Sequence, residues 1–368
     1  MTHHIVVIGA GYAGLAAAKR TARLVRGVDA TVTLINATDH FVERIRLHQV
    51  AAGQSIRRHP LRTLLGGAPV RLVVSRVTGI DPVARRVITD AGTVAYHTLV
   101  YALGSTVDLS SVPGAAEHAL SVADEPAALR VQERLAALRD GGTVTVVGGG
   151  LTGIETAAEV ATAHPWLRVR LITSGDLGGW LSSSGRQHLR RWFRAAGVEV
   201  RERTQVREVV QGKLTTDAGA IATDETVWAA GFRVPEIAAA AGFVTDHHGR
   251  MLVDATLRSV SHPDVYAVGD AAAATTTPDG APSRMSCQTA LPMGFAVARS
   301  IACRVTGQRP PTSRLRYVVT NISLGRRDGV VQPTHADDTP RQWALTGPTA
   351  ARVKDLICQG TVIALRRC

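Results

Sequence analysis

The chain alternates short apolar runs with longer stretches in which apolar residues recur every three or four positions. Short apolar runs are typical of strands buried on both faces, and the longer period is typical of amphipathic helices. Their alternation predicts parallel sheets joined by crossover helices, which is the α/β fold class. The pattern of residues 5–35 returns in residues 143–173, so the chain contains an internal repeat of a whole domain.

Strand positions follow from the apolar runs and from the polar or glycine residues that bound them. The first part of the chain has predicted strands at 5–8, 31–35, 71–74, 87–89 and 98–102, with the middle ones in a small antiparallel insertion. A second series is predicted at 143–147, 169–173, 198–201 and 226–235. Residues 110–118 contain proline and glycine, and they are predicted to be a linker.

Further elements are predicted toward the C-terminus. Residues 262–274 are expected to form a buried strand followed by a helix, and residues 288–305 are expected to form one more helix. The final segment, residues 306–368, is expected to contain mixed strands closed by a short amphipathic helix.

Two glycine-rich turns each follow a predicted strand and open a predicted helix. In the first, GAGYAG, the residues Gly9, Gly11 and Gly14 have the G-x-G-x-x-G spacing. The first glycine of such a turn allows a tight bend, the second lets a pyrophosphate approach the backbone, and the third lets helix and strand pack closely. The helix start attracts the pyrophosphate with its N–H groups. Because strand and helix flank the turn, a dinucleotide site is predicted, and a tight turn without a ligand is the alternative.

The second turn, GGGLTG, repeats this spacing with Gly148, Gly150 and Gly153. Such sites usually carry an acid about 20 residues further on, which binds the ribose hydroxyls. Here Asn36 and Ser174 stand at those two positions. The Asn36 amide can still donate to and accept from a ribose hydroxyl. Since Ser174 brings no charge that would repel a 2′-phosphate, the choice between NADH and NADPH stays open.

Length and composition bound the class of protein. The chain has 368 residues, of which 45% are hydrophobic and 20% charged, as expected for a globular protein of more than one domain. No run approaches the roughly 20 apolar residues of a membrane span. A strand is predicted within about four residues of the N-terminus, which leaves no room for a signal peptide. A cytoplasmic location is therefore expected.

The cysteines and the charge add little specific chemistry. Cysteines stand at 287, 303, 358 and 368, and none forms a CxxC pair, so their spacing predicts no metal site and no vicinal disulfide. The formal charge of +12 indicates attraction to an acidic surface, such as an anionic membrane face with which the chain would associate peripherally. No nucleic-acid-binding motif accompanies the charge, so nucleic acid is not a predicted partner.

Three further motifs carry a resemblance to a known family. LVYALGS (99–105) resembles the ATG-type motif that closes the first half of disulfide-reductase-like flavoproteins. VYAVGDAA (265–272) resembles their second flavin motif, in which an aspartate binds the ribityl chain, and VWAAGFRVP (227–235) is similar to the strand that returns from the nicotinamide domain. The chain therefore resembles the two-dinucleotide-binding flavoproteins of the pyridine nucleotide-disulfide oxidoreductase superfamily, with FAD in the first glycine turn and NAD(P)H in the second.

Within that superfamily the chain is most similar to type II NADH dehydrogenases and apoptosis-inducing-factor-like flavoproteins. GGGLTGIETAAEVA and FVERIRLHQVAAG (41–53) carry this likeness. Glutathione-reductase-like enzymes and sulfide:quinone reductases need cysteines in the first half, and residues 1–286 contain none. The AQxAxQ signature of the quinone enzymes is altered to CQTALP (287–292), and their long membrane-anchoring C-terminal helices are expected to be absent or much reduced. Both departures weaken quinone as the acceptor.

The resemblance implies a domain division and a set of site residues. The FAD domain would comprise 1–112 and 245–305, the NAD(P)H domain 113–244, and a small α+β segment 306–368. Predicted cofactor-binding residues are Gly9, Gly11, Ala13, Gly14, Asn36, Arg44, Val77, Gly104, Asp270 and Gln288 for FAD, and Gly148, Gly150, Gly153, Ser174 and Gly231 for the nicotinamide nucleotide.

For several of these residues, a structural role without any ligand contact is the alternative. Asp270 would bind the ribityl chain, or cap a helix. Glu155 is predicted to be catalytic, tuning hydride transfer or relaying protons, whereas an acid in the first turn of a helix is also favoured by the dipole alone. Gln288 is the second predicted catalytic residue: it would contact the flavin's pyrimidine edge, or cap its helix. Cys287 is expected to be a small hydrophobe rather than a reactive thiol. Lys354 is expected to be solvated.

Arg44, Arg46 and His48 remain open between two roles. They would line the reactive edge of the flavin, or they would be solvated or face phosphate groups.

The function implied by the resemblance is that of an FAD-dependent NAD(P)H oxidoreductase, which passes a hydride from nicotinamide to flavin and then electrons to a quinone or quinone-like small acceptor. Reduction of a ferredoxin- or rubredoxin-type electron carrier is the alternative enzyme activity, and the positive charge would suit it. A redox sensor that binds NADH without turnover is the alternative from another class. The oligomeric state stays open.

Overall fold

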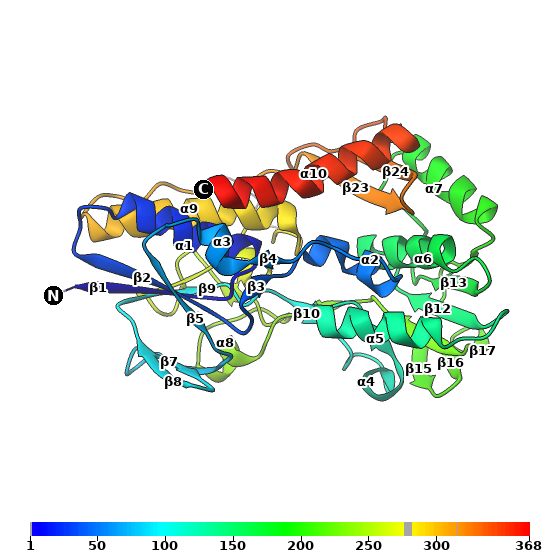
Figure 1. Cartoon of the computed structure of the whole chain (residues 1–368), viewed down its shortest axis with the longest axis horizontal. Coiled ribbons are helices and arrows are strands. Elements are labelled where there is room, and N and C mark those ends of the chain that lie inside the picture. Colours follow the sequence, from blue (N-terminus) through cyan, green and yellow to red (C-terminus); the bar gives the residue numbers. More distant parts are fainter. Residues whose placement is uncertain (1, 276–281, 314) are drawn as a thin grey trace.

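Two parallel five-stranded sheets, one in each half of the molecule, form the frame of the fold (Figure 1). The computed structural model describes residues 2–275, 282–313 and 315–368. The first sheet has the strand order β21-β9-β1-β2-β5. Its strands are β1 (His3–Ile8), β2 (Ala30–Asn36), β5 (Val70–Val74), β9 (Thr98–Tyr101) and β21 (Val265–Ala267). All neighbours are parallel, which confirms the predicted α/β class.

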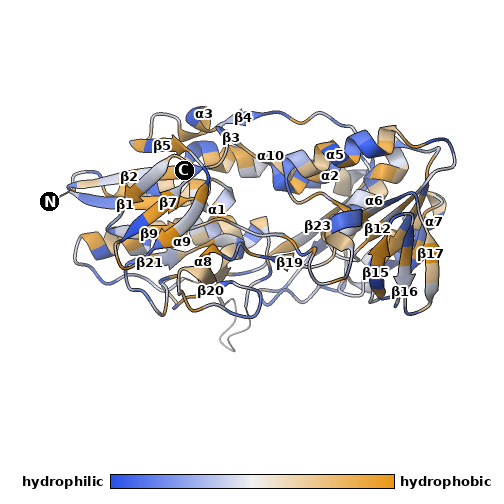
Figure 2. Cartoon of the chain, turned by 90° about the horizontal axis from the view of Figure 1, so that it is seen from below, coloured by the Kyte–Doolittle hydropathy of each residue, from blue (hydrophilic) through white to orange (hydrophobic). Residues whose placement is uncertain are grey.

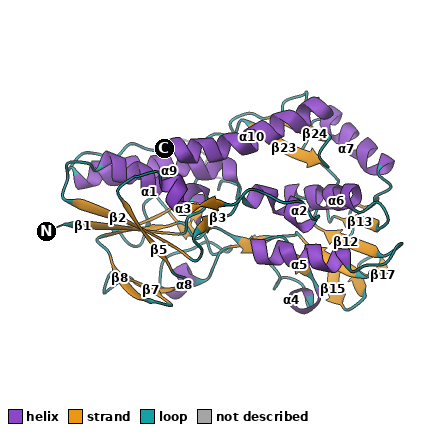
Figure 3. Ribbon diagram, viewed as in Figure 1, coloured by secondary structure: helices purple, strands orange, loops and turns teal. Residues whose placement is uncertain are grey.

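Helices cover one face of the first sheet, and a small antiparallel sheet lies on the other side (Figure 3). The helices are α1 (Tyr12–Leu24), α3 (Leu61–Leu65) and α9 (Cys287–Val305); the small sheet consists of β6 (Val77–Asp81), β7 (Arg86–Thr89) and β8 (Gly92–Ala95), with α8 (Ile237–Ala240) beside it. Helices α1 and α9 touch at Gly294, where a Cβ atom would lie 2.5 Å from the carbonyl oxygen of Ala13. On the other side of the sheet, the antiparallel pairing of β6, β7 and β8 confirms the predicted antiparallel insertion.

The second sheet repeats this plan with the order β11-β18-β12-β13-β14. It comprises β11 (Leu120–Ser121), β12 (Thr143–Val147), β13 (Arg168–Ile172), β14 (Glu199–Arg201) and β18 (Glu225–Trp228). Around it lie α4 (Ala115–His118), α5 (Glu125–Ala136), α6 (Leu151–Ala163), α7 (Ser183–Ala195) and the antiparallel strands β15 (Val206–Val210), β16 (Lys213–Thr216) and β17 (Gly219–Ala222). Apolar residues concentrate on the strands of both sheets (Figure 2), because helices or further strands cover both faces.

Short elements join the two halves. Helix α2 (Leu47–Ala51) packs on α5 and α6, and β10 (Thr106–Val107) pairs with β19 (Phe232–Arg233). The remaining short elements of the first half are β3 (His40–Phe41), β4 (His59–Pro60), a 3₁₀ turn at Arg44–Arg46, β20 (Met251–Leu252), a 3₁₀ turn at Gly269–Ala271 and β22 (Ala272–Ala273). The division at residues 112, 244 and 305 stays a prediction.

The C-terminal segment lies across the top of both halves (Figure 1). It contains β23 (Val319–Leu324), β24 (Asp328–Pro333), β25 (Leu345–Thr346) and α10 (Pro348–Arg367). Helix α10 packs on β23 and β24 near its beginning and reaches α1 and α3 near its end. This 20-residue helix is longer than the short helix that the sequence predicts.

A buried lysine binds the end of α10. Lys19 of α1 is fully buried, and its Nζ donates to the carbonyl oxygens of Leu365 (2.6 Å), Arg366 (3.0 Å) and Leu64 (2.5 Å). The carbonyl end of a helix attracts cations, so this ammonium group stabilises the C-terminal turns of α10. Burial lowers the pKa of Lys19.

Two predicted elements are wrong. Residues 110–118 are not a plain linker, because Ala115–His118 form helix α4. After β21, the alanine-rich residues 270–274 form a 3₁₀ turn and the strand β22 rather than a helix. The reason is tertiary: Ala272 and Ala273 pair with Met251 and Leu252 of β20, and this pairing overrides the helix propensity of alanine.

Candidate functional site

One large cavity lies between the two halves and reaches both glycine turns. Its volume is about 1230 Å³, which exceeds the roughly 300–1,000 Å³ of most small-molecule pockets. Its wall includes Gly11 and Asp270 from the first half, Gly150 and Glu155 from the second half, and Lys354 from the C-terminal segment. A cavity of this size has room for two large ligands side by side.

The glycines of the two turns have matching geometry. Gly9 and Gly148 have positive φ angles of 93° and 130°, which favour glycine. A Cβ atom on Gly14 or Gly153 would lie 1.9 Å from the carbonyl oxygen of Gly9 or Gly148, respectively. These four glycines therefore shape the strand-to-helix turns by internal packing.

The middle glycines have a different environment. Gly11 and Gly150 are the N-caps of α1 and α6, their backbones are extended, and a Cβ atom on either would meet no protein atom within 4 Å. Neither cap is closed by a side-chain hydrogen bond. Open backbone N–H groups at a helix start are suited to an anion such as a pyrophosphate, so both turns fit a dinucleotide.

Asn36 lines the cavity at the end of β2 and also holds the first glycine turn. Its Oδ1 accepts from the Ala10 N–H (2.9 Å), and its Nδ2 donates to the Thr38 carbonyl oxygen (2.9 Å). At the equivalent position of the second half, Ser174 is exposed and does not contribute to the cavity wall. The predicted ribose contacts of Asn36 and Ser174 stay predictions.

Asp270 forms a polar cluster on the cavity wall with Ser105 and Arg44. The Ser105 hydroxyl donates to Asp270 Oδ2 (2.7 Å), and Arg44 Nη1 lies 3.3 Å from Ser105 Oγ and 3.7 Å from Asp270 Oδ2. Asp270 lies inside a 3₁₀ turn rather than before a helix, so the capping alternative is wrong. A carboxylate in this position is suited to the hydroxyl groups of a ribityl chain.

The remaining residues predicted for FAD line the same cavity, with one exception. Ala13, Val77, Gly104 and Gln288 are part of its wall, whereas Gly14 is packed beneath the turn. Of the residues predicted for the nicotinamide nucleotide, Gly150 alone lines the cavity; Gly148, Gly153, Ser174 and Gly231 do not.

Gln288, the second predicted catalytic residue, reaches the C-terminal segment. Its amide nitrogen donates to the Val319 carbonyl oxygen (2.9 Å), and its amide oxygen accepts from the Val318 N–H (2.7 Å). The neighbouring Cys287 also lines the cavity, and burial raises the pKa of its thiol to about 12. A thiol with so high a pKa stays protonated near neutral pH and is a poor nucleophile. All four cysteines are free.

Glu155 is the centre of a buried network that the sequence does not indicate. The residue is 6% exposed, and its Oε1 accepts from the Ser323 N–H (2.8 Å) and the Ser323 hydroxyl (3.0 Å). The Lys354 ammonium group forms an ion pair with the same oxygen. Helix α6 begins at Leu151, so Glu155 lies in its second turn, and the first-turn alternative for this acid is wrong.

The expectation that Lys354 is solvated is also wrong. Lys354 is 8% exposed, and burial lowers the pKa of its ammonium group to about 8. The sequence holds one signal for this: Lys354 stands with Ala350, Cys358 and Leu365 on the buried face of α10. A lysine on an apolar helix face needs a partner, and Glu155 is that partner.

His48 of α2 completes the network. Its Nε2 lies 3.2 Å from Ser323 Oγ, and its Nδ1 lies 4.0 Å from Glu155 Oε2. Burial, with the nearby Lys354 ammonium group, lowers the pKa of His48 well below its usual value, so the imidazole is neutral. Of the two arginines grouped with it, Arg44 lines the cavity, whereas Arg46 pairs with Asp355 of α10 (2.6 Å).

Three buried polar atoms on the cavity wall have neither a hydrogen-bond partner nor an ion-pair partner within the part of the chain that the structure describes. They are Tyr12 Oη, Asn321 Oδ1 and Thr334 Oγ1. Buried polar atoms are normally satisfied, so these three are candidates for contacts with bound cofactor or substrate. The sequence pattern does not single them out.

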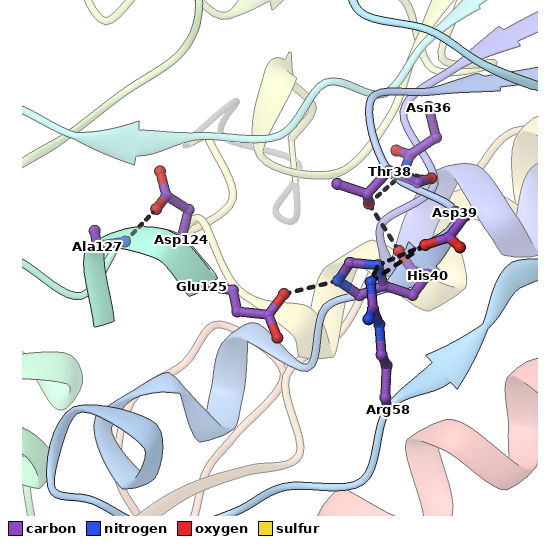
Figure 4. A network of polar contacts seen from close by, with 8 residues as sticks. All are labelled: Asn36, Thr38, Asp39, His40, Arg58, Asp124, Glu125 and Ala127. Atoms are coloured by element: carbon purple, nitrogen blue, oxygen red, sulfur yellow. Dashed lines mark hydrogen bonds and ion pairs between the residues drawn. The ribbon is translucent and has the colours of Figure 1, made fainter. Parts of the chain in front are cut away.

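A second polar cluster, around His40 and Glu125, joins the two halves of the molecule at the cavity (Figure 4). His40 of β3 lines the wall, and its Nε2 lies 2.7 Å from Oε2 of Glu125, the first residue of α5. Asp124 lines the wall beside it and caps α5 by accepting from the Ala127 N–H (2.8 Å). No sequence motif singles out His40, Asp124 or Glu125.

Two parallel sheets with matching glycine turns, both opening into one cavity, define a protein that binds two dinucleotides next to each other. Comparison with known proteins agrees with this class. Residues 3–294 match the family described as pyridine nucleotide-disulphide oxidoreductase. The chain belongs to this family, and it is a flavoprotein oxidoreductase with FAD and NAD(P)H as its cofactors.

Individual relatives cover most of the chain. An NADH dehydrogenase-like protein of Mycobacterium tuberculosis is 35% identical over 347 residues, which cover 89% of this chain and 86% of the relative. A type II NADH:quinone oxidoreductase of Staphylococcus saprophyticus is 26% identical over 358 residues, covering 89% of this chain and 88% of the relative. The structure of the sulfide:quinone oxidoreductase of Aquifex aeolicus, 21% identical, superposes with a TM-score of 0.84 over 100% of this chain and 92% of that chain.

Proposed function

We propose that this protein is an FAD-dependent NAD(P)H oxidoreductase that holds FAD in the first glycine turn, admits the nicotinamide nucleotide at the second, and reduces a quinone or quinone-like small molecule. When bound, FAD supplies two-electron chemistry between the nicotinamide and the acceptor. The observation that carries the proposal is the single cavity, which joins both glycine turns to the buried Glu155–Lys354 pair. The name of the staphylococcal relative supports quinone as the acceptor class.

The chain's own residues would bind the cofactor and handle protons. Gly11 presents the start of α1 to a pyrophosphate, and Asp270, fixed by Ser105, faces the cavity where a ribityl chain would lie. Reduction of a quinone-like acceptor also consumes protons. The Lys354 ammonium group, with a pKa of about 8 and a place on the cavity wall, is suited to hold such a proton next to Glu155.

The first test is anaerobic reduction of the purified yellow protein by NADH and by NADPH, followed by a panel of acceptors. We expect at least one nucleotide to bleach the flavin absorbance and a soluble quinone to restore it. If neither nucleotide bleaches the flavin, the proposal fails. If a ferredoxin-type protein restores the absorbance and quinones do not, the acceptor class is wrong, and the charge of +12 would favour that acidic carrier.

The assignment of the two turns is tested with G11A and G150A. Both positions have extended backbones and room for a Cβ atom, so neither substitution should change the unfolding temperature of the cofactor-free protein. We expect G11A to weaken FAD binding by about tenfold or more, because the methyl group occupies space next to the pyrophosphate. G150A should keep its FAD and raise the KM for NAD(P)H by a similar factor. If G11A instead raises the KM for NAD(P)H and G150A weakens FAD binding, the assignment of the two cofactors to the two turns is reversed.

We further infer a peripheral association with the cytoplasmic face of a membrane. No helix in residues 2–275, 282–313 or 315–368 is long and apolar enough to span a bilayer. The outer face of α10 carries Leu356 and Ile363, which are 66% and 45% exposed, between Arg352 and Arg366. Exposed apolar residues flanked by arginine are suited to an anionic lipid surface.

A further inference from the structure

Thr173 and Ser174 follow β13 at the edge of the second sheet, next to the second glycine turn. Such a strand end usually carries the carboxylate that binds the ribose hydroxyls of NADH. Both residues are uncharged, and Thr173 is taken up by packing, because a Cβ atom on Gly149 would clash with its Oγ1. NADH therefore lacks its usual ribose partner at these two positions, and a 2′-phosphate meets no carboxylate from them.

Arg203 lies beside Ser174. Its backbone N–H donates to the carbonyl oxygen of Gly175 (3.2 Å), and the N–H of the next residue, Thr204, donates to the carbonyl oxygen of Thr173 (3.0 Å). These two hydrogen bonds join the segment after β14 to the residues on both sides of Ser174. They place Arg203 next to the strand end where the ribose of a nucleotide in the second turn would lie.

Asp176 holds the Arg203 side chain in one orientation. Arg203 Nε lies 2.7 Å from Asp176 Oδ1, and Nη2 lies 3.3 Å from Oδ2, so the two groups form a bidentate pair. Nη1 has no hydrogen-bond partner among residues 2–275, 282–313 and 315–368, and the side chain is largely exposed. A guanidinium group fixed in this way keeps N–H groups for a phosphate, which it binds well because of its planar shape.

The charges at this edge also favour an added phosphate. Asp176 is already paired with Arg203, and its pKa is lowered by Arg203 first and then by Arg190 and Arg186. The carboxylate of Glu202 is paired with Arg190. Arg186 of α7 has no ion-pair partner within the described ranges of the chain. Three guanidinium groups and two carboxylates leave a net charge of +1, which attracts the additional negative charge of a 2′-phosphate.

We propose that Arg203, held by Asp176, binds the 2′-phosphate of NADPH, so that this protein uses NADPH in preference to NADH. This proposal rests on the proposed binding of the nicotinamide nucleotide at the second glycine turn. A carboxylate at the strand end is the usual partner of free ribose hydroxyls, and a nearby arginine is the usual partner of a 2′-phosphate. At this strand end the carboxylate is replaced by uncharged residues, and the arginine is in place.

The test compares the two nucleotides in anaerobic flavin reduction, by the apparent Kd and the limiting rate for each. We expect the wild-type protein to bind NADPH about tenfold or more tightly than NADH, because bonds between charged groups are strong. The limiting rates should be similar, since the 2′-phosphate is remote from the nicotinamide ring. R203Q should weaken NADPH by about tenfold and leave NADH unchanged.

A second variant approaches the same site from the other side. S174D places a carboxylate at the strand end, so it should weaken NADPH binding without weakening NADH binding. A wild-type protein that binds NADH more tightly than NADPH would overturn the proposal. An R203Q variant that weakens both nucleotides equally would also overturn it, because Arg203 would then have a structural role only.

The matched control is R85Q. Arg85 resembles Arg203 in two respects: its φ angle is 53°, against 51° for Arg203, and its Nη2 lies 2.6 Å from an aspartate oxygen, Oδ2 of Asp264. It stands between β6 and β7 in the first half, away from the second glycine turn. R85Q should keep the wild-type preference. If it lowers the preference for NADPH as much as R203Q does, the effect is not specific and the proposal fails.

A further measurement separates this proposal from the proposed function, because it needs no electron transfer. Calorimetric titration measures the binding of adenosine 2′,5′-bisphosphate and of adenosine 5′-monophosphate to the FAD-loaded protein. We expect the bisphosphate to bind about tenfold or more tightly, with a smaller difference at high salt, and R203Q to remove the difference. Equal binding of the two by the wild-type protein would overturn the role of Arg203. Tighter binding of the bisphosphate without flavin reduction by either nucleotide would overturn the proposed function alone.

Discussion

Two buried lysines, Lys19 and Lys354, are more informative about this protein than its four free cysteines. The chain has 42 basic residues, and two of its three lysines, Lys19 and Lys354, are buried. A buried ammonium group is unfavourable unless it is paired, and each of these two has a partner of its own. Lys19 binds helix carbonyl groups, which stabilises the fold, whereas Lys354 binds the Glu155 carboxylate on the cavity wall, where reacting groups would lie.

The Lys354 ammonium group should control the acceptor reaction through its charge. Its pKa of about 8 means that it is charged below this pH and loses its charge above it. We expect reoxidation of the reduced flavin by a quinone to fall as pH rises through about 8, because fewer molecules then hold the proton. The double variant E155Q/K354M removes both charges at once, which avoids leaving one buried charge unpaired. It should react at least about tenfold more slowly and without this pH dependence.

Stopped-flow reoxidation measures this prediction, and K213M is its control. Lys213 is exposed on β16, so its replacement should leave the rate and its pH profile unchanged. A double variant that keeps the decline above pH 8 would show that another group titrates there.

At the scale of elements, α10 connects parts of the molecule that the two sheets leave separate. Near its start, Lys354 and Asp355 pair with Glu155 of α6 and Arg46 of the first half. At its end, Lys19 of α1 binds its last carbonyl groups, helped by Arg23, whose Nη1 donates to the Arg367 carbonyl oxygen (2.8 Å). Polar contacts at both ends thus hold α10 over the cavity.

Removing the Lys19 ammonium group should loosen the end of α10 and its attachment to the end of α3. K19M deletes three hydrogen bonds to carbonyl oxygens but keeps most of the apolar stem. We expect the free energy of unfolding to fall by about 2–3 kcal/mol, since buried carbonyl groups lose a charged donor. Hydrogen exchange over residues 362–368 should become faster, while flavin reduction by NAD(P)H stays unchanged. Equal loosening in K213M would contradict a specific role for Lys19.

For the whole molecule, the net charge and the outer face of α10 point to the same kind of surface. Leu356 and Ile363 are seven positions apart and share one helix face, with arginines at both ends of the exposed stripe. The formal charge of +12 adds a longer-ranged attraction to anionic lipid. Neither feature serves the cavity, which opens between the two halves.

Binding to lipid vesicles tests this at the scale of the whole chain. We expect sedimentation with vesicles that contain anionic lipid, weakened by salt because charged contacts are screened. L356S/I363S should lower the partition coefficient by about tenfold, since two apolar side chains no longer enter the interface. Leu129 on α5 is 49% exposed and lies elsewhere, so L129S is the matched control. Equal binding by the wild-type protein and L356S/I363S would show that this face of α10 does not contact the membrane.

The sequence by itself determined the local parts of this protein. A strand, a glycine turn and a helix are contiguous, so both turns, the sheets that contain them and the family could be predicted from neighbouring residues. The place of Asp270 on the cavity wall agrees with the resemblance of residues 265–272 to the second flavin motif, and its binding of the ribityl chain stays a prediction. The predicted strands were mostly right for the same reason, since strand burial leaves a continuous apolar run.

Only the tertiary structure decided which distant side chains meet. Lys354 and Glu155 are 199 positions apart, and His40 and Glu125 are 85 apart, so no local pattern relates them. The alanines after Asp270 became a strand because β20 pairs with them, against their helix propensity. Apolar periodicity records whether a position is buried, but a buried charge follows from its partner, and the partner is chosen when the chain folds.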